Sequence, residues 1–241
     1  MLIKAACLTA VWGLALLFAS SVQADGYYAA IEGGGRFLEH ASVRETGAGA
    51  PLPAARLEGG FDAGSAVGVT FGKYLQQNLR TEVEMQWSSN ALDHLGVRRD
   101  GGLGATLNTP ALSGQRVRTG GDLEAIALMV NAFYEVDYGL LRPYFGAGVG
   151  LADLNLRKSR LTGVGNQRFT SPVALADDNT TVLAYQAGAG VALPLSTSWT
   201  MAVDYRYFAS EDAAFDLQVG AGRLQSEYGS HNVIASLRYD F

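Results

Sequence analysis

The stretch that decides the fold runs Trp199-Thr-Met-Ala-Val-Asp-Tyr-Arg-Tyr-Phe208. Its odd positions are apolar or aromatic, whereas Thr200, Asp204 and Arg206 occupy even positions. An alternation of period two is typical of a β-strand that has one face in an apolar medium and the other in a polar one. A helix does not produce this pattern, because helical side chains return to the same face about every 3.6 residues. The stretch is therefore predicted to be a two-faced strand.

The same alternation recurs along the rest of the chain. Near the C-terminus, Val233, Leu237 and Phe241 share one face, while Arg238 and Asp240 share the other. We find eight alternating segments, with boundaries uncertain by about two to four residues. They cover residues 26–38, 63–73, 79–90, 122–136, 143–156, 181–194, 198–209 and 229–241. The chain is therefore predicted to be all-β.

The connections between these segments alternate strictly in length. Short links at 74–78, 137–142 and 195–197 alternate with long ones. An antiparallel up-and-down barrel with tight turns at one rim and long loops at the other has this pattern. The prediction is an eight-stranded antiparallel up-and-down barrel. Its four long loops are expected at about 39–62, 91–121, 157–180 and 210–228.

Alternation alone does not say which face points outward, because a soluble barrel with an apolar interior has the same stripes. Three features favour a transmembrane barrel. Glycines such as Gly148 and Gly188 crowd the polar face, where a narrow lumen needs small residues. Aromatic residues lie near both ends of the apolar face, and the last residue, Phe241, continues that face. The predicted lipid-facing wall includes Val83, Met85, Val149, Leu151, Val203, Tyr205, Leu237 and Tyr239.

The first residues have the composition of a secretory signal peptide. Lys4 precedes an apolar run at 8–18, and Val22-Gln-Ala24 is a small-x-small cleavage pattern. Residues 1–24 are therefore expected to be a signal peptide that is cut after Ala24, and residues 25–241 the barrel. The only cysteine, Cys7, would leave with the signal, so no disulfide is expected. A formal net charge of −5 argues against nucleic acid as a partner.

Two glycine-rich segments carry a family resemblance. Arg142-Pro-Tyr-Phe-Gly-Ala-Gly-Val-Gly-Leu151 and Tyr185-Gln-Ala-Gly-Ala-Gly-Val191, together with 199–208, resemble the small outer-membrane β-barrel family. This family includes opacity-type surface proteins and the OmpA-like transmembrane barrel domain. The resemblance implies a place in the Gram-negative outer membrane with the long loops extracellular. Tyr239 and Phe241 resemble the signal that such proteins present to the barrel assembly machinery.

With the apolar face outward, the polar stripe lines the lumen. Six carboxylates and three arginines would then share that space with two amides. They form either a hydrogen-bonded plug or a narrow porin-like ion path, and the small bore of eight strands favours the plug. The predicted lumen network consists of Glu32, Arg80, Glu82, Glu84, Asn131, Glu135, Gln186, Asp204, Arg206, Arg238 and Asp240.

The histidines provide the only candidates for catalysis. His40, His94 and His231 all fall at or above the rim of the long loops, and no two have metal-ligand spacing. No set of nucleophile, base and orienting group can be placed. We therefore predict no catalytic residue, no metal and no cofactor. A lipid-modifying enzyme or protease at the loop rim stays a less favoured alternative.

Two of the long loops are basic. Their cations either bind phosphates of lipopolysaccharide or simply keep mobile loops solvated. The expected function is that of a non-enzymatic surface protein, which contributes envelope structure, surface contact or adhesion. Its partners would be outer-membrane lipid, lipopolysaccharide and an extracellular or host ligand. The candidate lipopolysaccharide contacts are Arg98, Arg99, Arg116, Arg118, Arg157, Lys158, Arg160 and Arg168.

Overall fold

The computed structural model describes residues 26–39, 41–46, 56–99, 113–164, 167–216, 223–226 and 228–241. The predicted signal peptide with its cleavage residue Ala24, and also His40, lie outside these residues. The described chain forms one twelve-stranded antiparallel sheet that closes on itself through the pairing of β5 with β6. No helix within the described ranges is long and apolar enough to cross a membrane.

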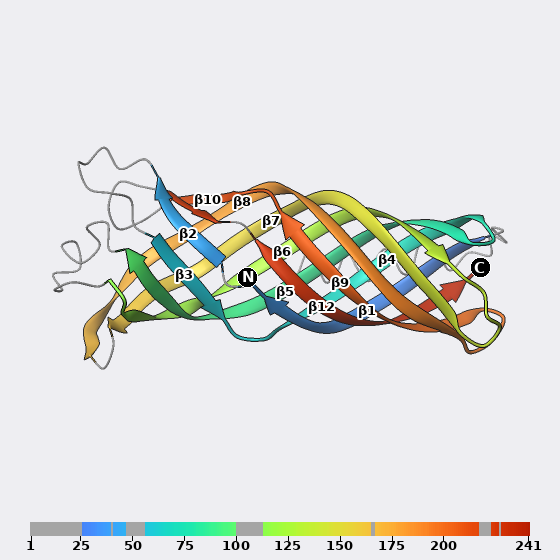
Figure 1. Cartoon of the computed structure of the whole chain (residues 1–241), viewed down its shortest axis with the longest axis horizontal. Coiled ribbons are helices and arrows are strands. Elements are labelled where there is room, and N and C mark those ends of the chain that lie inside the picture. The colour runs from blue at the N-terminus through green and yellow to red at the C-terminus, as the bar shows by residue number, and fades with distance from the viewer. Residues whose placement is uncertain are drawn as a thin grey trace.

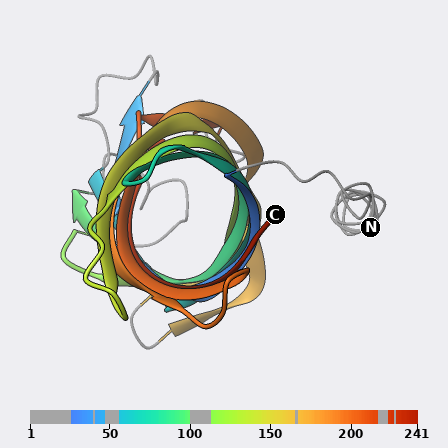
Figure 2. The same ribbon diagram turned by 90° about the vertical axis from the view of Figure 1, so that its right-hand side faces the viewer.

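Eight strands form a closed ring, which we call the proximal ring (Figures 1 and 2). Each strand pairs with its neighbours in the barrel order, and β1 completes the ring by pairing with both β4 and β12. This arrangement confirms the predicted eight-stranded antiparallel barrel. The strands are β1 (Tyr27–Leu38), β4 (Gly64–Gln76), β5 (Leu79–Arg99), β6 (Arg116–Glu135), β7 (Arg142–Val164), β8 (Gln167–Pro194), β9 (Trp199–Ser210) and β12 (Gly229–Asp240).

The proximal ring is apolar outside and polar inside. Val203 is 51% exposed, whereas its chain neighbours Asp204 and Ala202 are buried. The predicted wall residues are exposed, except for Met85 and Leu237, which are half-buried. An apolar exterior around a charged interior suits a solvent of lipid chains, in which every backbone group must be paired within the ring. The face assignment made from the alternation is therefore confirmed.

Aromatic rings gather at both ends of the apolar wall. At the end with the tight turns, the Trp199 and Tyr239 rings lie 4.8 Å apart, and Tyr239 lies 5.3 Å from Phe241. At the other end, Tyr205 and Tyr207 flank the ring of His231. Such girdles mark the two interfaces between lipid and water.

The prediction of four long loops was wrong in extent. Strands β5 to β8 continue far beyond their expected ends at residues 90, 122, 156 and 181. Four short strands add to them: β2 (Ala41–Thr46), β3 (Arg56–Phe61), β10 (Ala213–Asp216) and β11 (Arg223–Ser226). The four short strands pair in the order β3–β2–β11–β10, with β3 on the edge of β5 and β10 against β8.

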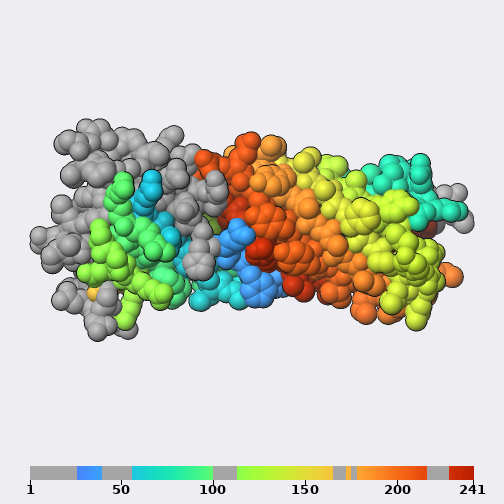
Figure 3. All heavy atoms as spheres, viewed as in Figure 1, coloured from blue at the N-terminus to red at the C-terminus, as the bar shows by residue number. Residues whose placement is uncertain are grey.

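These eight segments form a second ring on top of the first, which we call the distal ring. In Figure 1 it lies at the end opposite the tight turns and the C-terminus, and Figure 3 shows both rings as one elongated body. Within the predicted loops 91–121 and 157–180, residues 91–99, 116–121, 157–164 and 167–180 are regular strand. The alternation is interrupted by register shifts between Ala91 and His94, between Gly120 and Asp122, and between Leu156 and Ser159. A β-bulge shifts the parity of the pattern, which explains why the predicted strands stop there.

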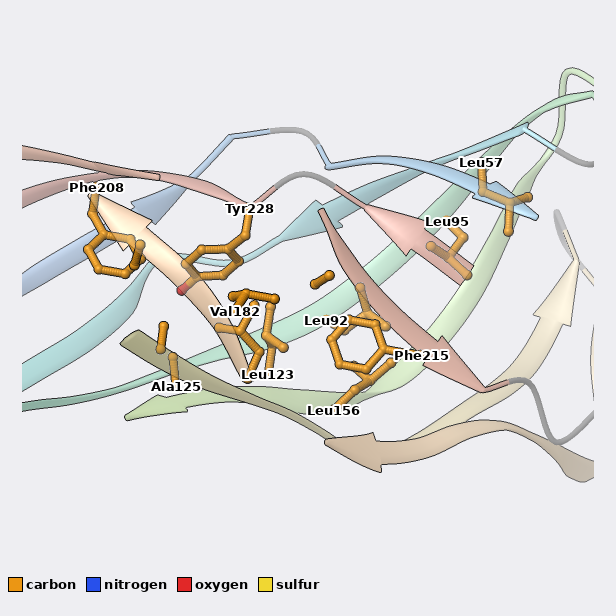
Figure 4. Packing of buried hydrophobic residues seen from close by; sticks show 14 of the residues in the cluster. Leu57, Leu92, Leu95, Leu123, Ala125, Leu156, Val182, Phe208, Phe215 and Tyr228 are labelled. Carbon is orange, nitrogen blue, oxygen red and sulfur yellow. The ribbon is translucent and has the colours of Figure 1, made fainter. Parts of the chain in front are cut away.

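The distal ring has an apolar interior (Figure 4). Leu154, Leu161 and Val117 are each 1% exposed, so these side chains are packed against one another. The outward neighbours Arg160 and Arg118 are exposed and charged. The distal ring thus has the polarity of a soluble barrel, whereas the proximal ring has the opposite polarity. The cluster is made of Leu57, Leu92, Leu95, Val97, Val117, Leu123, Ala125, Ala127, Met129, Ala152, Leu154, Leu156, Leu161, Val164, Val182, Ala184, Phe208, Ala213, Phe215 and Tyr228.

Candidate functional site: the charged interior and the basic outer face

The charged interior begins with a cluster near the tight turns. Arg80 donates from Nε to Glu135 Oε1 at 2.7 Å and also forms an ion pair with Glu82. Arg238 reaches the same Glu135 oxygen at 3.0 Å. The Tyr28 hydroxyl donates to Glu82 Oε2 at 2.6 Å. Two guanidinium groups therefore share two carboxylates, and a phenol completes the hydrogen bonding of this buried group.

A second cluster, centred on Arg206, lies on the middle of the strands. Its Nε donates to Asp204 Oδ1 at 2.6 Å. Its Nη2 donates to Glu32 Oε2 at 3.1 Å, and its Nη1 lies 3.0 Å from Glu84 Oε2. Arg206, Asp204, Glu32 and Glu84 are all buried. A single guanidinium from β9 therefore ties together carboxylates from β1, β5 and β9 across the bore.

Two amides join the clusters. Asn131 Nδ2 donates to Glu84 at 2.7 Å and to Glu82 at 3.2 Å. Gln186 Nε2 donates to Glu84 at 2.9 Å and to the Asn131 side-chain oxygen at 2.8 Å. Every residue of the predicted lumen network is therefore buried and connected, except for Asp240. The Asp240 side chain is 30% exposed, and its Oδ1 lies 3.7 Å from Arg238 Nε.

The prediction missed a fourth interior arginine, Arg36 on β1. It is 1% exposed and donates to Ser230 Oγ at 2.9 Å and to Ser88 Oγ. Its guanidinium also lies over the rings of Phe208 and Tyr228, at 5.0 and 5.1 Å from their centroids. Its spacing of four residues from Glu32 places it on the same strand face, and that parity could have identified it. Since Phe208 and Tyr228 belong to the apolar cluster, Arg36 marks the boundary between the two interiors.

The predicted basic residues differ in their surroundings. Arg98 forms an ion pair with Glu58 at 2.7 Å, and Arg157 forms one with Glu124 at 3.2 Å. The hydrogen bond from Arg98 to Glu58 raises the pKa of the guanidinium. Arg168 lies in β8 opposite Gly163, with a side chain outside the described part. The others are exposed on the distal ring: Arg99, Arg116, Arg118, Lys158 and Arg160.

The two described histidines lie apart from the charged interior. His94 Nδ1 lies 2.8 Å from Asp93 Oδ2 on β5. His231 lies on the outer face of β12, where Nδ1 is 2.6 Å from the Tyr205 hydroxyl and Nε2 is 3.0 Å from Glu39 Oε1. Within the described residues, no group of three His, Cys, Asp or Glu side chains could hold a metal ion.

Comparison with known proteins agrees with this architecture. Residues 12–241 match the model of the outer membrane protein beta-barrel domain. No curated protein matches the chain. Among solved structures, the chain is similar to the outer membrane protein OprG from Pseudomonas aeruginosa, with 14% identity and a TM-score of 0.53 over 90% of this chain and 96% of that one. It is also similar to the outer membrane protease OmpT from Escherichia coli, with 8% identity and a TM-score of 0.50 over 93% and 99% of the two chains. At these identities the likeness is one of fold.

Proposed function

Because the chain belongs to the outer membrane protein beta-barrel domain family, we propose that it is a closed, non-enzymatic surface protein whose distal ring contacts the cell exterior. Its place is the Gram-negative outer membrane, where the apolar wall of the proximal ring faces the lipid. In this orientation the tight turns face the periplasm and the distal ring is extracellular.

The observation that carries the proposal is the filling of both rings. In the proximal ring, Arg206 and its three carboxylate partners occupy the bore. In the distal ring, the apolar cluster fills the interior, and Leu154 and Leu161 are each 1% exposed. An ion would have to break paired charges and then leave its water at an apolar section, and both steps are costly. The geometry therefore supports a plug over the alternative of a narrow porin-like channel.

The described surroundings of the histidines contain no side-chain nucleophile, so any hydrolysis there would have to use water activated by an imidazole. The partners described for His94 and His231 are Asp93, Tyr205 and Glu39, none of which is a serine, threonine or cysteine nucleophile. Since OmpT, a similar fold, is a protease, the matter calls for a direct assay. We expect peptide cleavage and lipid A profiles to be the same with the wild-type chain and with a His40/His94/His231 triple alanine variant. An activity lost in that variant would refute the non-enzymatic proposal.

The partners follow from the outer surfaces. We propose that the wall binds outer-membrane lipid and that the distal ring meets lipopolysaccharide and an extracellular or host ligand. The exposed Tyr239, whose ring is tilted against that of Trp199 and meets Phe241 edge-on, would be presented to the barrel assembly machinery during insertion. Loss of insertion on changing both Tyr239 and Phe241 to alanine is the expected result.

Single-channel recording tests whether the barrel is closed. The processed chain, reconstituted in planar bilayers, is expected to give no steady conductance. The matched variant Arg206→Ala reports on the plug, and Lys73→Ala, at the end of the barrel, serves as a control. A steady wild-type conductance that changes in Arg206→Ala but not in Lys73→Ala would establish the porin-like alternative.

A further inference from the structure

We propose that four outward cations of the distal ring bind the inner-core phosphates of the lipopolysaccharide molecules packed around the barrel. We call Arg116, Arg118, Lys158 and Arg160 the cationic plate. They lie on the outer face of β6 and β7 and are exposed. The proposal rests on the proposed function, because it requires the distal ring to stand on the cell surface.

The cationic plate is built on regular strands rather than on loops. Val117, between the two β6 arginines, is 1% exposed and pairs with Val164 of β7. Leu161, next to Arg160, is also 1% exposed, and the Thr162 hydroxyl donates to the Arg118 carbonyl at 3.2 Å. The apolar cluster thus holds the backbone that carries the charges. A surface that is ordered before binding loses less entropy when an anion arrives.

A bulge brings additional charge to the same face. The register of β7 against β8 shifts between Leu156 and Ser159, and Lys158 has a φ of 50°. A non-glycine side chain in this left-handed region strains the backbone. The bulge allows the consecutive residues Arg157 and Lys158 both to avoid the buried inner face. A strained backbone that places a lysine outward is consistent with a binding role.

The charges of the cationic plate lack anionic partners within the described residues. Elsewhere in these ranges, Arg98 is paired with Glu58, Arg157 with Glu124 and Arg142 with Asp137. No ion pair is found for the four plate residues in the same ranges. Across β5, Arg118 faces His94, whose ring lies 2.8 Å from Asp93, and between β6 and β7 the carboxylate of Asp122 belongs to the residue opposite Arg157. Across β8, Arg160 faces Ala174. The plate is therefore available to phosphate groups, which guanidinium forks bind well.

The height of the plate selects the layer of lipopolysaccharide that it meets. The last exposed apolar residue of β7 on the wall is Leu151, and Arg160 follows nine residues later. With a rise of about 3.3 Å per residue and a tilt of about 45°, Arg160 stands roughly 20 Å above the apolar wall. The lipid A phosphates lie at the edge of the hydrocarbon, a level at which this face carries Asp153 and, above it, the ion pair of Glu124 with Arg157. The inner-core sugars with their phosphates occupy the layer above, where the plate lies.

The experiment compares two double variants with the same change in formal charge. Arg116→Gln/Arg160→Gln removes half of the plate. Lys73→Gln/Arg142→Gln removes two cations at the opposite end of the barrel. Each processed chain is folded in detergent, and a heat-dependent shift in gel mobility verifies that the barrel is folded. Binding is measured to lipopolysaccharide with a phosphorylated heptose core, to lipopolysaccharide truncated before the heptoses, and to inorganic phosphate.

We expect the wild-type chain to bind the phosphorylated core about 10-fold or more tightly than the truncated form. The reason is that the cations of the plate would attract the heptose phosphates, which the truncated form lacks. The plate variant should lose this preference, the control variant should keep it, and added salt should weaken it. Equal binding of both lipopolysaccharides, or a plate variant that binds like the wild type, would overturn the proposal. Competition by millimolar inorganic phosphate would also overturn it, since the plate would then be a site for any small anion. The conductance and enzyme assays do not depend on these binding results. They therefore test the closed, non-enzymatic barrel separately from the cationic plate.

Discussion

At the scale of single residues, chain neighbours of the proximal ring face opposite media. Val203 is half exposed on the wall, and the next residue, Asp204, is a buried partner of Arg206. Because the side-chain period of a strand is two, one apolar and one charged side chain can be only one residue apart. The identity of each residue is therefore constrained by the side of the sheet on which it lies.

The first prediction concerns the wall. Val203→Arg places a charge near the middle of the lipid-facing surface and should destabilise the folded barrel by about 2–4 kcal/mol. Urea unfolding in lipid vesicles measures the loss. The control is Leu195→Arg in the β8–β9 turn, which is exposed beyond the end of the strands and should change the unfolding free energy little. Equal stability of both variants would mean that lipid does not touch the Val203 side of β9.

The second prediction concerns a lumen glycine. A Cβ atom on Gly148 would collide with the Asn131 amide and lie 2.8 Å from the Val130 carbonyl oxygen. Asn131 is the amide that bridges the two carboxylate clusters, so Gly148→Ala should destabilise the barrel by about 1–3 kcal/mol. In the control Gly33→Ala, the nearest atom would be 3.7 Å from the new Cβ. The same vesicle assay measures both variants, and a greater loss in Gly33→Ala contradicts the steric argument.

At the scale of elements, β6 and its neighbours reverse their polarity along their length. The inward side of β6 changes from Asn131 to Met129 and Ala127, while the outward side changes from Ile126 to Glu124. In the proximal ring, the outward face of β6 is therefore apolar and contacts lipid. In the distal ring, its inward face is apolar and its outward face contacts water. The reversal follows the change of surrounding solvent. The end of the strand in the membrane exposes apolar side chains to lipid, and the end above the membrane exposes polar side chains to water.

This reversal also explains how far the sequence could be interpreted. Regular alternation predicted the proximal ring, its faces and the burial of Arg206, Glu84 and Gln186, because parity is a local property. The distal ring was missed because bulges such as the one at Lys158 change the parity without a local signature. The pairing of β2 with β11 joins segments that are far apart in the chain, and short-range patterns carry no information about such contacts.

The third prediction tests the apolar core of the distal ring. Leu161→Asp buries a charge in that core and should unfold the distal ring, while the proximal ring stays folded. Limited trypsin digestion in detergent detects the change as new cleavage at Arg118 and Arg160, which paired strands protect in the wild type. The control is Thr162→Asp, on the adjacent outward position. Cleavage at these arginines in the wild type would show that the distal ring is not stably folded.

At the scale of the whole molecule, the two rings share β5, β6, β7 and β8. The distal ring is therefore a continuation of the barrel wall and not a separate cap. In the proposed orientation, the tight turns and the C-terminus lie on one side of the membrane and the distal ring on the other (Figure 1).

The fourth prediction tests this orientation. The chain has a single cysteine, Cys7, which lies in the predicted signal peptide, so introduced cysteines would be labelled selectively in a chain that lacks residues 1–24. Ala174→Cys, on exposed β8 of the distal ring, should react with a membrane-impermeant maleimide on intact cells. Leu140→Cys, in the β6–β7 turn, replaces a residue that is 72% exposed but should react only after the outer membrane has been permeabilised. The reverse pattern of labelling would invert the assigned orientation.

The shared strands also determine when the protein can be completed. Closing the distal ring requires β10 and β11 to join β8 to β2, and closing the proximal ring requires β12 to join β9 to β1. All three strands lie within residues 213–240. Without residues 213–240, both rings are therefore open. We expect membrane insertion of the proximal ring and closure of the distal ring to be completed together.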